Sequence, residues 1–207
     1  MKLIRDFYEK DARLLAKDLL GKVLVHKIDD ILLKGKIIET EAYIGAIDKA
    51  SHAYGGRMTQ RVAPLYGPAG TVYVYFVYGM HYCFNIVAGQ EGMAEGVLIR
   101  ALEPLYNVDY MSQARFNKNY CELTKTQIKN LTNGPAKLCA AMKIGKNNNW
   151  QNVIENDELY LEEPNYSDTL DLKDIVVTKR IGIDYAEEAI DFPWRFYIKG
   201  NNWVSRL

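Results

Sequence analysis

Hydrophobic positions recur with a helical period near the start of the chain and with a strand period directly after it. Leucines repeat at helical spacing between Asp11 and Leu20, where Asp11 can cap the first turn and Gly21 can end the helix. Two alternating segments follow and meet at Asp29-Asp30, as is typical of a β-hairpin. This pattern predicts one helix and then two paired strands, Lys22–Ile28 and Ile31–Tyr43.

The rest of the chain continues as strands, then helices, then strands again. Three further helices are predicted, one of which begins at a proline in its favoured first turn, at Tyr106–Phe116, Lys125–Leu131 and Pro135–Met142. Six further strands are predicted, at Thr71–Val77, Tyr82–Val87, Gly96–Leu102, Glu158–Leu161, Ile175–Ile181 and Arg195–Lys199. We see no repeat or linker, so we expect a single α+β domain over residues 1–207, built on an antiparallel sheet.

Composition narrows the class of protein. The 207 residues suit one domain with a hydrophobic core, and no apolar run has the length of a membrane span or the form of a signal peptide. A soluble intracellular protein is therefore expected. Lys+Arg equals Asp+Glu, which counts against a strong nucleic-acid binder without excluding one. The three cysteines lack CxxC spacing, so we expect buried, inert thiols rather than disulfides or a zinc site.

Two carboxylates lie close together near the end of the second predicted strand. Strict alternation places four side chains on one face, Ile37, Glu39, Glu41 and Tyr43. One interpretation is a solvated edge, with the opposite face packed inside through Ile38, Thr40 and Ala42. The other is a carboxylate held on a rigid strand as a general base. This stretch alone favours neither.

The chain has three histidines, and only one is a candidate for chemistry. His26 is expected to be a surface or half-buried strand residue, and His81 to be exposed in a turn. His52 lies in a loop before Gly55-Gly56-Arg57, where the backbone could approach a phosphate, although no P-loop or dinucleotide motif is present.

Residues 71–85, TVYVYFVYGMHYCFN, concentrate aromatic rings in one hairpin. Alternation predicts a core face and a second face that carries Tyr73 and Tyr75, with Tyr78 and Met80 at the exposed tip. The core face is expected to consist of Val72, Val74 and Phe76. The spacing leaves three interpretations open: an aromatic cluster packed under a helix, a protein-contact patch, or a stacking and wedge surface for nucleic-acid bases.

Several segments in this order resemble the alkyladenine (3-methyladenine) DNA glycosylases of the mammalian type. They are GKIIETEAYIG with His52 after it, GPAGTVYVYFVYGMHYCFNIV, LIRALEP, NGPAKLC and RFYIKGNNWVS. Together they run from about residue 3 to residue 205, which is nearly the whole chain.

The resemblance implies a base-excision repair enzyme with a curved antiparallel sheet, surrounding helices and a protruding β-hairpin. Such enzymes act as monomers on double-stranded DNA, hydrolyse the N-glycosidic bond of a flipped, damaged purine and leave an abasic site, without a metal or other cofactor. The implied substrates are 3-methyladenine and other alkylated purines, with hypoxanthine and ethenoadenine as further candidates. The implied location is the cytoplasm or nucleoid, or the nucleus in a eukaryote.

The resemblance also assigns roles to residues. It makes Glu41 the general base, assisted by Arg100 and by the backbone carbonyl of Ile181. The base pocket corresponds to Tyr43, His52, Tyr75 and Asn85, with Asn85 excluding the exocyclic amine of guanine. Tyr78 corresponds to the residue that fills the gap in the duplex, and Met80 lies beside it.

Our own candidates for phosphate contacts are four cations for which a solvated surface position is an equally good interpretation: Arg57, Arg61, Arg115 and Lys137. The chain departs from the family pattern in its zero net charge, in Val62–Tyr66 and at His81, so loop contacts to DNA near residues 62–66 carry no assignment.

Three rival functions are considered. A non-catalytic reader of damaged or distorted DNA on the same fold would not need Glu41 and Arg100. A zinc base deaminase would need the HxE…PCxxC signature, which is absent from the sequence. A protein-interaction module would not need the ETEAY face together with His52.

Overall fold

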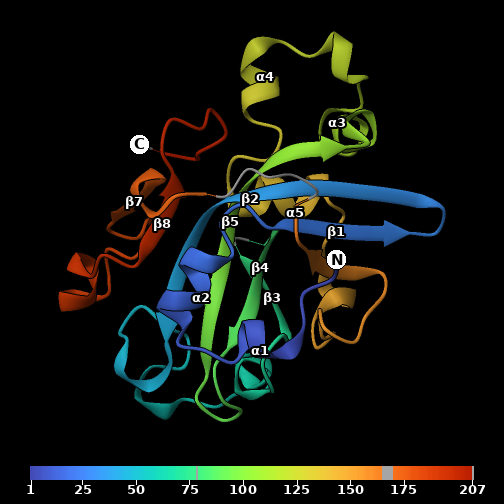
Figure 1. The fold of residues 1–207 in the computed structure, drawn as a ribbon. Helices are drawn as coiled ribbons and strands as arrows, with labels where there is room; N and C mark the ends of the chain where they lie inside the picture. The colour runs from blue at the N-terminus through green and yellow to red at the C-terminus, as the bar shows by residue number, and fades with distance from the viewer. Residues whose placement is uncertain (78, 165–169, 207) are drawn as a thin grey trace.

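The computed structural model describes residues 1–77, 79–164 and 170–206. Its centre is a curled antiparallel sheet in the strand order β3-β4-β5-β2-β1-β6, with β8 paired to β2 and β7 paired to β8 (Figure 1). The strands are β1 (Val23–Ile28), β2 (Ile31–Ile44), β3 (Val72–Val77), β4 (His81–Ala88), β5 (Glu95–Tyr106), β6 (Leu159–Glu162), β7 (Ile175–Thr178) and β8 (Arg195–Ile198). The prediction of one α+β domain on a curved antiparallel sheet is confirmed.

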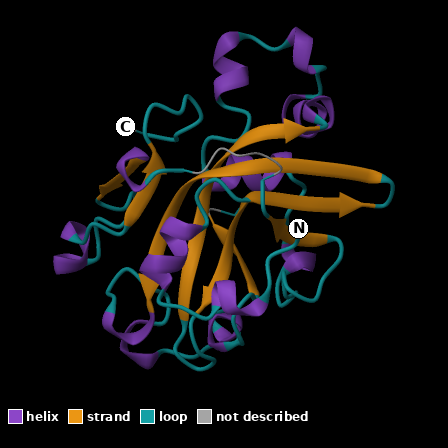
Figure 2. Cartoon of the chain, in the orientation of Figure 1, coloured by secondary structure: helices purple, strands orange, loops and turns teal. Residues whose placement is uncertain are grey.

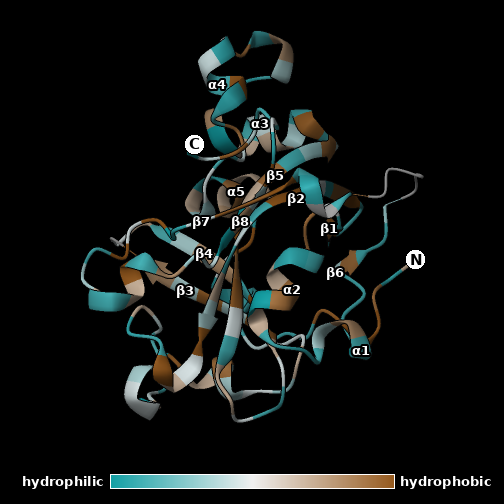
Figure 3. Cartoon of the chain, turned by 60° about the vertical axis from the view of Figure 1, so that its left-hand side comes forward, coloured by the Kyte–Doolittle hydropathy of each residue, from teal (hydrophilic) through white to brown (hydrophobic). Residues whose placement is uncertain are grey.

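Short helices surround the sheet (Figure 2). The α-helices are α1 (Arg5–Tyr8), α2 (Ala12–Asp18), α3 (Val108–Phe116), α4 (Lys125–Lys129) and α5 (Pro135–Ala141). Single 3₁₀ turns occur at η1 (Gly45–Ile47), η2 (Tyr54–Gly56), η3 (Ala63–Tyr66), η4 (Tyr120–Glu122), η5 (Lys146–Asn148), η6 (Leu172–Asp174) and η7 (Glu187–Asp191). Helix α4 is mostly hydrophilic and lies away from the sheet (Figure 3). No helix in the described ranges is long and apolar enough to cross a membrane.

Local sequence signals placed most elements correctly. The Asp11 side chain accepts a hydrogen bond from the backbone N–H of Arg13, as expected of the cap of α2. β1 and β2 pair as a hairpin through Asp29, whose φ is +53°. The main difference is that β5 extends to Tyr106, where a helix had been expected to begin, and α3 begins at Val108.

The two faces of the sheet are covered differently. One face carries the main hydrophobic core, which α2 and α5 pack against through buried residues such as Leu15, Leu19, Leu138 and Met142. The other face is covered by loops and 3₁₀ turns, with small separate apolar clusters around Leu65, Ile183 and Val204. Because loops cover a sheet less completely than helices do, this second face is where a cavity can form.

A double bulge between β2 and β5 reverses the side-chain alternation of both strands. Ile37 pairs with Leu102, Glu39 with Ala101, and Thr40 with Ile99, so Ile38 and Arg100 are each an extra residue. Ile37 therefore packs in the main core, and Ile38 packs on the other face with Ala101 and Val204. The prediction that Ile37 shares a face with Glu39 was wrong for this reason.

The solvated-edge interpretation of this stretch was also wrong. Glu39 and Glu41 are fully buried, because β8 (Arg195–Ile198) and the segment after it cover this side of β2. Thr40 lies on the core side as expected, where its hydroxyl donates to the backbone carbonyl of Ala16 at 2.7 Å.

Three other predictions of burial were wrong. Phe76 is 48% exposed rather than part of the core, because the β3–β4 hairpin extends beyond the core; the Phe76 ring packs against Tyr82. His26 is buried, and one ring nitrogen lies 2.7 Å from the carbonyl of Met142. Cys121 is exposed, although Cys83 and Cys139 are buried as expected.

Replacement of Ile37 by alanine tests the assignment of faces. Since Ile37 is fully buried in the main core, we expect Ile37→Ala to lower the free energy of unfolding by about 2–5 kcal/mol in chemical denaturation. Ile47→Ala is the matched control, because Ile47 is 75% exposed, and it should leave stability nearly unchanged. Equal losses in the two variants would contradict the bulged register.

Candidate active site

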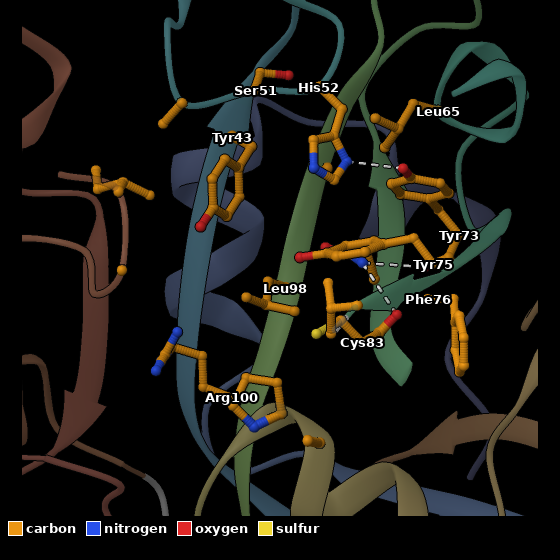
Figure 4. Close-up of a pocket in the computed structure, with 18 of the residues that line it drawn as sticks. Tyr43, Ser51, His52, Leu65, Tyr73, Tyr75, Phe76, Cys83, Leu98 and Arg100 are labelled. Atoms are coloured by element: carbon orange, nitrogen blue, oxygen red, sulfur yellow. Dashed lines mark hydrogen bonds between the residues drawn. The ribbon is translucent and has the colours of Figure 1, made fainter. Parts of the chain in front are cut away.

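A cavity of about 580 Å³ lies on the sheet face opposite the main core. Its walls come from β2, β3, β4 and β5, from the loop around His52, from the N-terminal end of α5 and from residues 181–185 (Figure 4). The volume falls in the range of ordinary small-ligand sites. Seven of the residues predicted from the sequence line it: Tyr43, His52, Arg61, Tyr75, Asn85, Arg100 and Ile181.

Two tyrosines from different strands point into this cavity. Tyr43 projects from β2 and Tyr75 from β3 (Figure 4). Burial raises the pKa of both phenols well above the ordinary value, and the negative charge of Glu41 adds to the shift at Tyr43. Both rings are therefore neutral, and their faces are available to an aromatic or cationic ligand.

His52 forms one end of the aromatic wall and is fixed by Tyr73. The Nδ1 atom of His52 lies 2.8 Å from the hydroxyl oxygen of Tyr73, and the imidazole meets the Tyr75 ring edge-on at 4.7 Å between centroids. Burial, together with the charges of Arg61 and Arg57, lowers the pKa of His52, so the imidazole is neutral at neutral pH. Tyr73, which had no predicted role, thus orients the His52 ring.

Asn85 lies within β4, and Met80 lies at the hairpin tip just before this strand. The amide nitrogen of Asn85 donates to the carbonyls of Tyr73 at 3.0 Å and Cys83 at 3.5 Å, which holds the buried side chain against β3. Met80 is 69% exposed at the turn, as the alternation of the hairpin predicts. Tyr78 lies outside the described residues.

Glu41 lies directly behind residues that line the cavity. One carboxylate oxygen accepts from the Tyr43 hydroxyl at 2.8 Å and pairs with Arg100 at 3.1 Å. The other accepts from the backbone N–H of Ile181 at 2.8 Å. A carboxylate has about four acceptor positions. These contacts use three, so one acceptor position has no donor among the described residues.

Arg100 is shared by two buried carboxylates. Its Nε donates to Glu39 at 3.0 Å, while its terminal nitrogen pairs with Glu41. Burial by itself would lower the pKa of Arg100, but the charges of Glu41 and Glu39 outweigh burial and raise it. The guanidinium is therefore a permanent cation beside the cavity.

Sequence reasoning missed an ion pair behind Tyr43. Arg180 makes two parallel contacts to the fully buried carboxylate of Asp48, at 2.5 and 2.8 Å, and donates to the carbonyl of Ala42 at 2.9 Å. Its Cζ atom lies 4.7 Å from the centroid of the Tyr43 ring. Because Ile181 follows Arg180 directly, this pair fixes both the Tyr43 ring and the N–H that binds Glu41. The only available signal was that Arg180 precedes Ile181.

The four residues predicted to contact phosphates lie in two different parts of the structure. Arg57 is exposed near the cavity, and Arg61 lies at its rim, where it donates to the carbonyl of Phe76 at 3.2 Å. Arg115 and Lys137 lie together near Asn130, and burial lowers the pKa of both, with the charge of Arg115 adding to the shift at Lys137. None of the four forms an ion pair with a described acidic residue.

The arrangement has the features of a hydrolytic site for an aromatic leaving group. It combines flat aromatic walls, a buried carboxylate with one acceptor position that no described residue fills, and an arginine that neutralises this carboxylate. Within the described ranges no three His, Cys, Asp or Glu side chains come together as a metal site would require.

Comparison with known proteins identifies the family. The family model described as methylpurine-DNA glycosylase matches residues 6–202. A protein of Clostridium botulinum strain Hall is 62% identical over 205 residues, which cover 99% of each chain. A second, from strain Alaska of the same species, is 56% identical over 206 residues and the full length of both chains. Both relatives carry the provisional name 3-methyladenine DNA glycosylase.

The chain belongs to the methylpurine-DNA glycosylase family and is a hydrolytic DNA glycosylase of base-excision repair. The narrower expectation of a mammalian-type member is not supported, because the relatives reported above are bacterial.

The Asp48–Arg180 pair generates a prediction about stability. Asp48→Asn leaves the buried guanidinium of Arg180 without its counter-charge, so we expect a loss of about 3–5 kcal/mol in the free energy of unfolding. Asp191→Asn is the control, because Asp191 pairs with Lys179 at the surface and should change stability little. Similar denaturation midpoints for the two variants would show that the buried pair does not hold this part of the structure.

Proposed function

We propose that this protein flips an alkylated purine, such as 3-methyladenine, out of duplex DNA into the cavity and hydrolyses its N-glycosidic bond. The observation that carries the proposal is Glu41, a buried carboxylate held by three donors directly behind an aromatic-walled cavity. The names of the close relatives support the substrate class. We propose that residues 1–207 act as a single glycosylase domain and as a monomer, in the cytoplasm or on the nucleoid of a bacterial cell.

The aromatic walls fit the energetics of base flipping. Extrusion of a base from a duplex costs a few kcal/mol, and less when the base is damaged. Stacking on an aromatic side chain returns about 1–3 kcal/mol per base. Tyr43 and Tyr75 face the same cavity, and either ring would also attract the positive charge of an N-alkylated purine by about 0.5–2 kcal/mol.

Asn85 is proposed to exclude guanine from the cavity. Its amide is held by two backbone carbonyls, so the side chain is not free to move aside for the exocyclic amine of guanine. Adenine derivatives, hypoxanthine and ethenoadenine lack this amine, and they are therefore the further substrates that we propose.

The proposed reaction is hydrolysis with a single carboxylate base. The C1′–N bond breaks with its electron pair going to the purine, which neutralises an alkylated, cationic base. A water molecule attacks C1′ of the oxocarbenium-like sugar and gives its proton to Glu41, which leaves an abasic site. Arg100 and the backbone carbonyl of Ile181 are proposed to help to place this water. The chemistry requires both Glu41 and Arg100, so their pairing favours hydrolysis over a role as a non-catalytic reader.

The contact with DNA is proposed to involve the hairpin and nearby cations. Met80, with Tyr78, would enter the duplex and fill the space that the flipped base leaves. Arg57, Arg61, Arg115 and Lys137 would bind phosphates, which is supported by their lack of carboxylate partners among the described residues. A small number of such contacts is compatible with a net charge of zero.

The first test replaces the proposed base. Glu41→Gln should lower the single-turnover rate of 3-methyladenine release from methylated duplex DNA by about 10²–10⁴-fold, because the amide cannot accept the proton of the water. Binding of the same DNA should persist. Glu91→Gln, at an exposed turn, is the control and should keep the wild-type rate. Near-wild-type release by Glu41→Gln would refute the mechanism.

The second test concerns the wedge. Met80→Ala should reduce base release from duplex DNA several-fold while leaving release from single strands unchanged, because only the duplex has a stack to enter. Met93→Ala, which removes another exposed methionine outside the hairpin, should affect neither substrate. Equal losses on duplex and single-stranded DNA in Met80→Ala would exclude the wedge role.

A further inference from the structure

Glu39 is a fully buried carboxylate to which the proposed mechanism gives no role. Like Glu41, it is fully buried behind the residues that line the cavity, but protein donors occupy about all of its acceptor positions and leave none for a water molecule. Two arginines bind it from opposite directions. Arg100 donates to it at 3.0 Å from the side of the cavity, and Arg195 donates to it at 2.8 Å from β8.

The end of the described chain completes the surroundings of Glu39. The backbone N–H of Ser205 donates to one carboxylate oxygen at 2.7 Å, and the Ser205 hydroxyl donates to the other at 2.8 Å. The carboxylate thus receives four donors, which fill about all of its acceptor positions. A group satisfied in this way is held in one place and can hold its partner in turn.

The charges of this cluster balance. Glu39 and Glu41 contribute two negative charges, and Arg100 and Arg195 contribute two positive charges, in the order Arg195–Glu39–Arg100–Glu41. Because Arg100 is shared, its attraction to Glu41 is divided with Glu39. Without Glu39, the guanidinium would lose the hydrogen bond that fixes its Nε and would keep its ion pair with Glu41.

We infer that Glu39 is a positioning residue for the hydrolytic step: it holds the Arg100 guanidinium in the orientation that places the cation beside Glu41, and it is itself held by Arg195 and Ser205. The inference rests on the proposed function of Glu41 as the base. It assigns a part in catalysis to Arg195 and Ser205, which lie far from Glu41 in sequence. Arg195 is paired with Glu41 through the β2–β8 backbone ladder, but the side chains of Arg195 and Ser205 both bind Glu39.

A merely structural role for Glu39 predicts something different. If the carboxylate only satisfies buried arginines, its replacement should lower stability but leave the activity of the folded fraction intact. If it positions Arg100, its replacement should lower the rate of bond cleavage in the folded protein much more than it lowers the affinity for DNA.

The experiment uses Glu39→Gln, which preserves shape and removes charge. We expect the single-turnover rate of 3-methyladenine release at saturating enzyme to fall about 10- to 100-fold, the size of effect that misplacement of a catalytic group by about 1 Å produces. The dissociation constant for a duplex that carries a tetrahydrofuran abasic analogue should change much less. Glu95→Gln is the control: Glu95 is a half-buried carboxylate on the same strand pair that accepts from the N–H of Ala12, outside the cluster.

The split between rate and affinity separates positioning from packing. A rate that falls in Glu39→Gln while the dissociation constant is retained supports positioning, and Glu95→Gln should change neither quantity. An unchanged rate in the folded Glu39→Gln variant would overturn the inference.

Ser205→Ala keeps the test decisive if Glu39→Gln does not fold. Ser205 is only partly buried, and this variant removes one donor to Glu39 without changing any charge. We expect a smaller fall in the rate with the abasic-analogue affinity retained, and a wild-type rate would count against the positioning role. Failure of the two proposals is distinguishable. If Glu41→Gln abolishes release but Glu39→Gln does not affect it, only the positioning role is wrong, whereas active Glu41→Gln refutes the proposed mechanism itself.

Discussion

The geometry of the site depends on one break in the ladder between β2 and β5. Each strand carries one extra residue there, Ile38 on β2 and Arg100 on β5, so the pairing resumes in register while the alternation of both strands is reversed. Apolar side chains before the break, such as Ile37, therefore lie in the main core, while the charged side chains of Glu39 and Glu41 lie on the opposite face. The break also lies where β2 changes partner, from β1, which pairs up to Lys36, to β8, which pairs from Glu39.

Charge balance is the second constraint on this face. Four ionised groups lie in the cluster around Arg100, and two more form the Asp48–Arg180 pair. A buried charge without its partner destabilises a fold by several kcal/mol, so each carboxylate here needs an arginine and each arginine a carboxylate. The result is a rigid set of donors around Glu41. The proposed base is therefore already ordered before DNA binds.

Some of this could be read from the sequence and some could not. The cap at Asp11 and the turn at Asp29-Asp30 are local signals, and the elements that they predict are present. Alternation identified Tyr75 as lying on a different face from Val74, but it could not tell that the core ends before Phe76. Nor could alternation detect the bulge, because the inserted residue, Ile38, is apolar like Ile37 before it.

Contacts between residues far apart in the sequence were the other feature that could not be predicted. Seven of the residues that the family resemblance or the charge pattern pointed to line one cavity in the structure. The groups that hold them received no role from the sequence. Arg195 and Ser205 lie in the segment RFYIKGNNWVS, but its pattern does not indicate a contact with Glu39. The ion pair between Asp48 and Arg180, which are 132 positions apart, leaves no trace in spacing. Tyr73 is a similar case, because its role comes from a hydroxyl that reaches His52 across the cavity wall.

The contact of Arg180 with Tyr43 makes the two aromatic walls electrically unequal. The guanidinium, 4.7 Å from the ring centroid, already draws on the electron density of the Tyr43 π-system. Tyr75 has a cation only at 5.7 Å, from Arg61 at the rim. The Tyr43 hydroxyl also donates to the Glu41 carboxylate at 2.8 Å, so this wall has a fixed charge of each sign beside it. The two walls thus differ in their fixed charges, and the orientation of a ligand in the cavity would carry an electrostatic preference as well as a steric one.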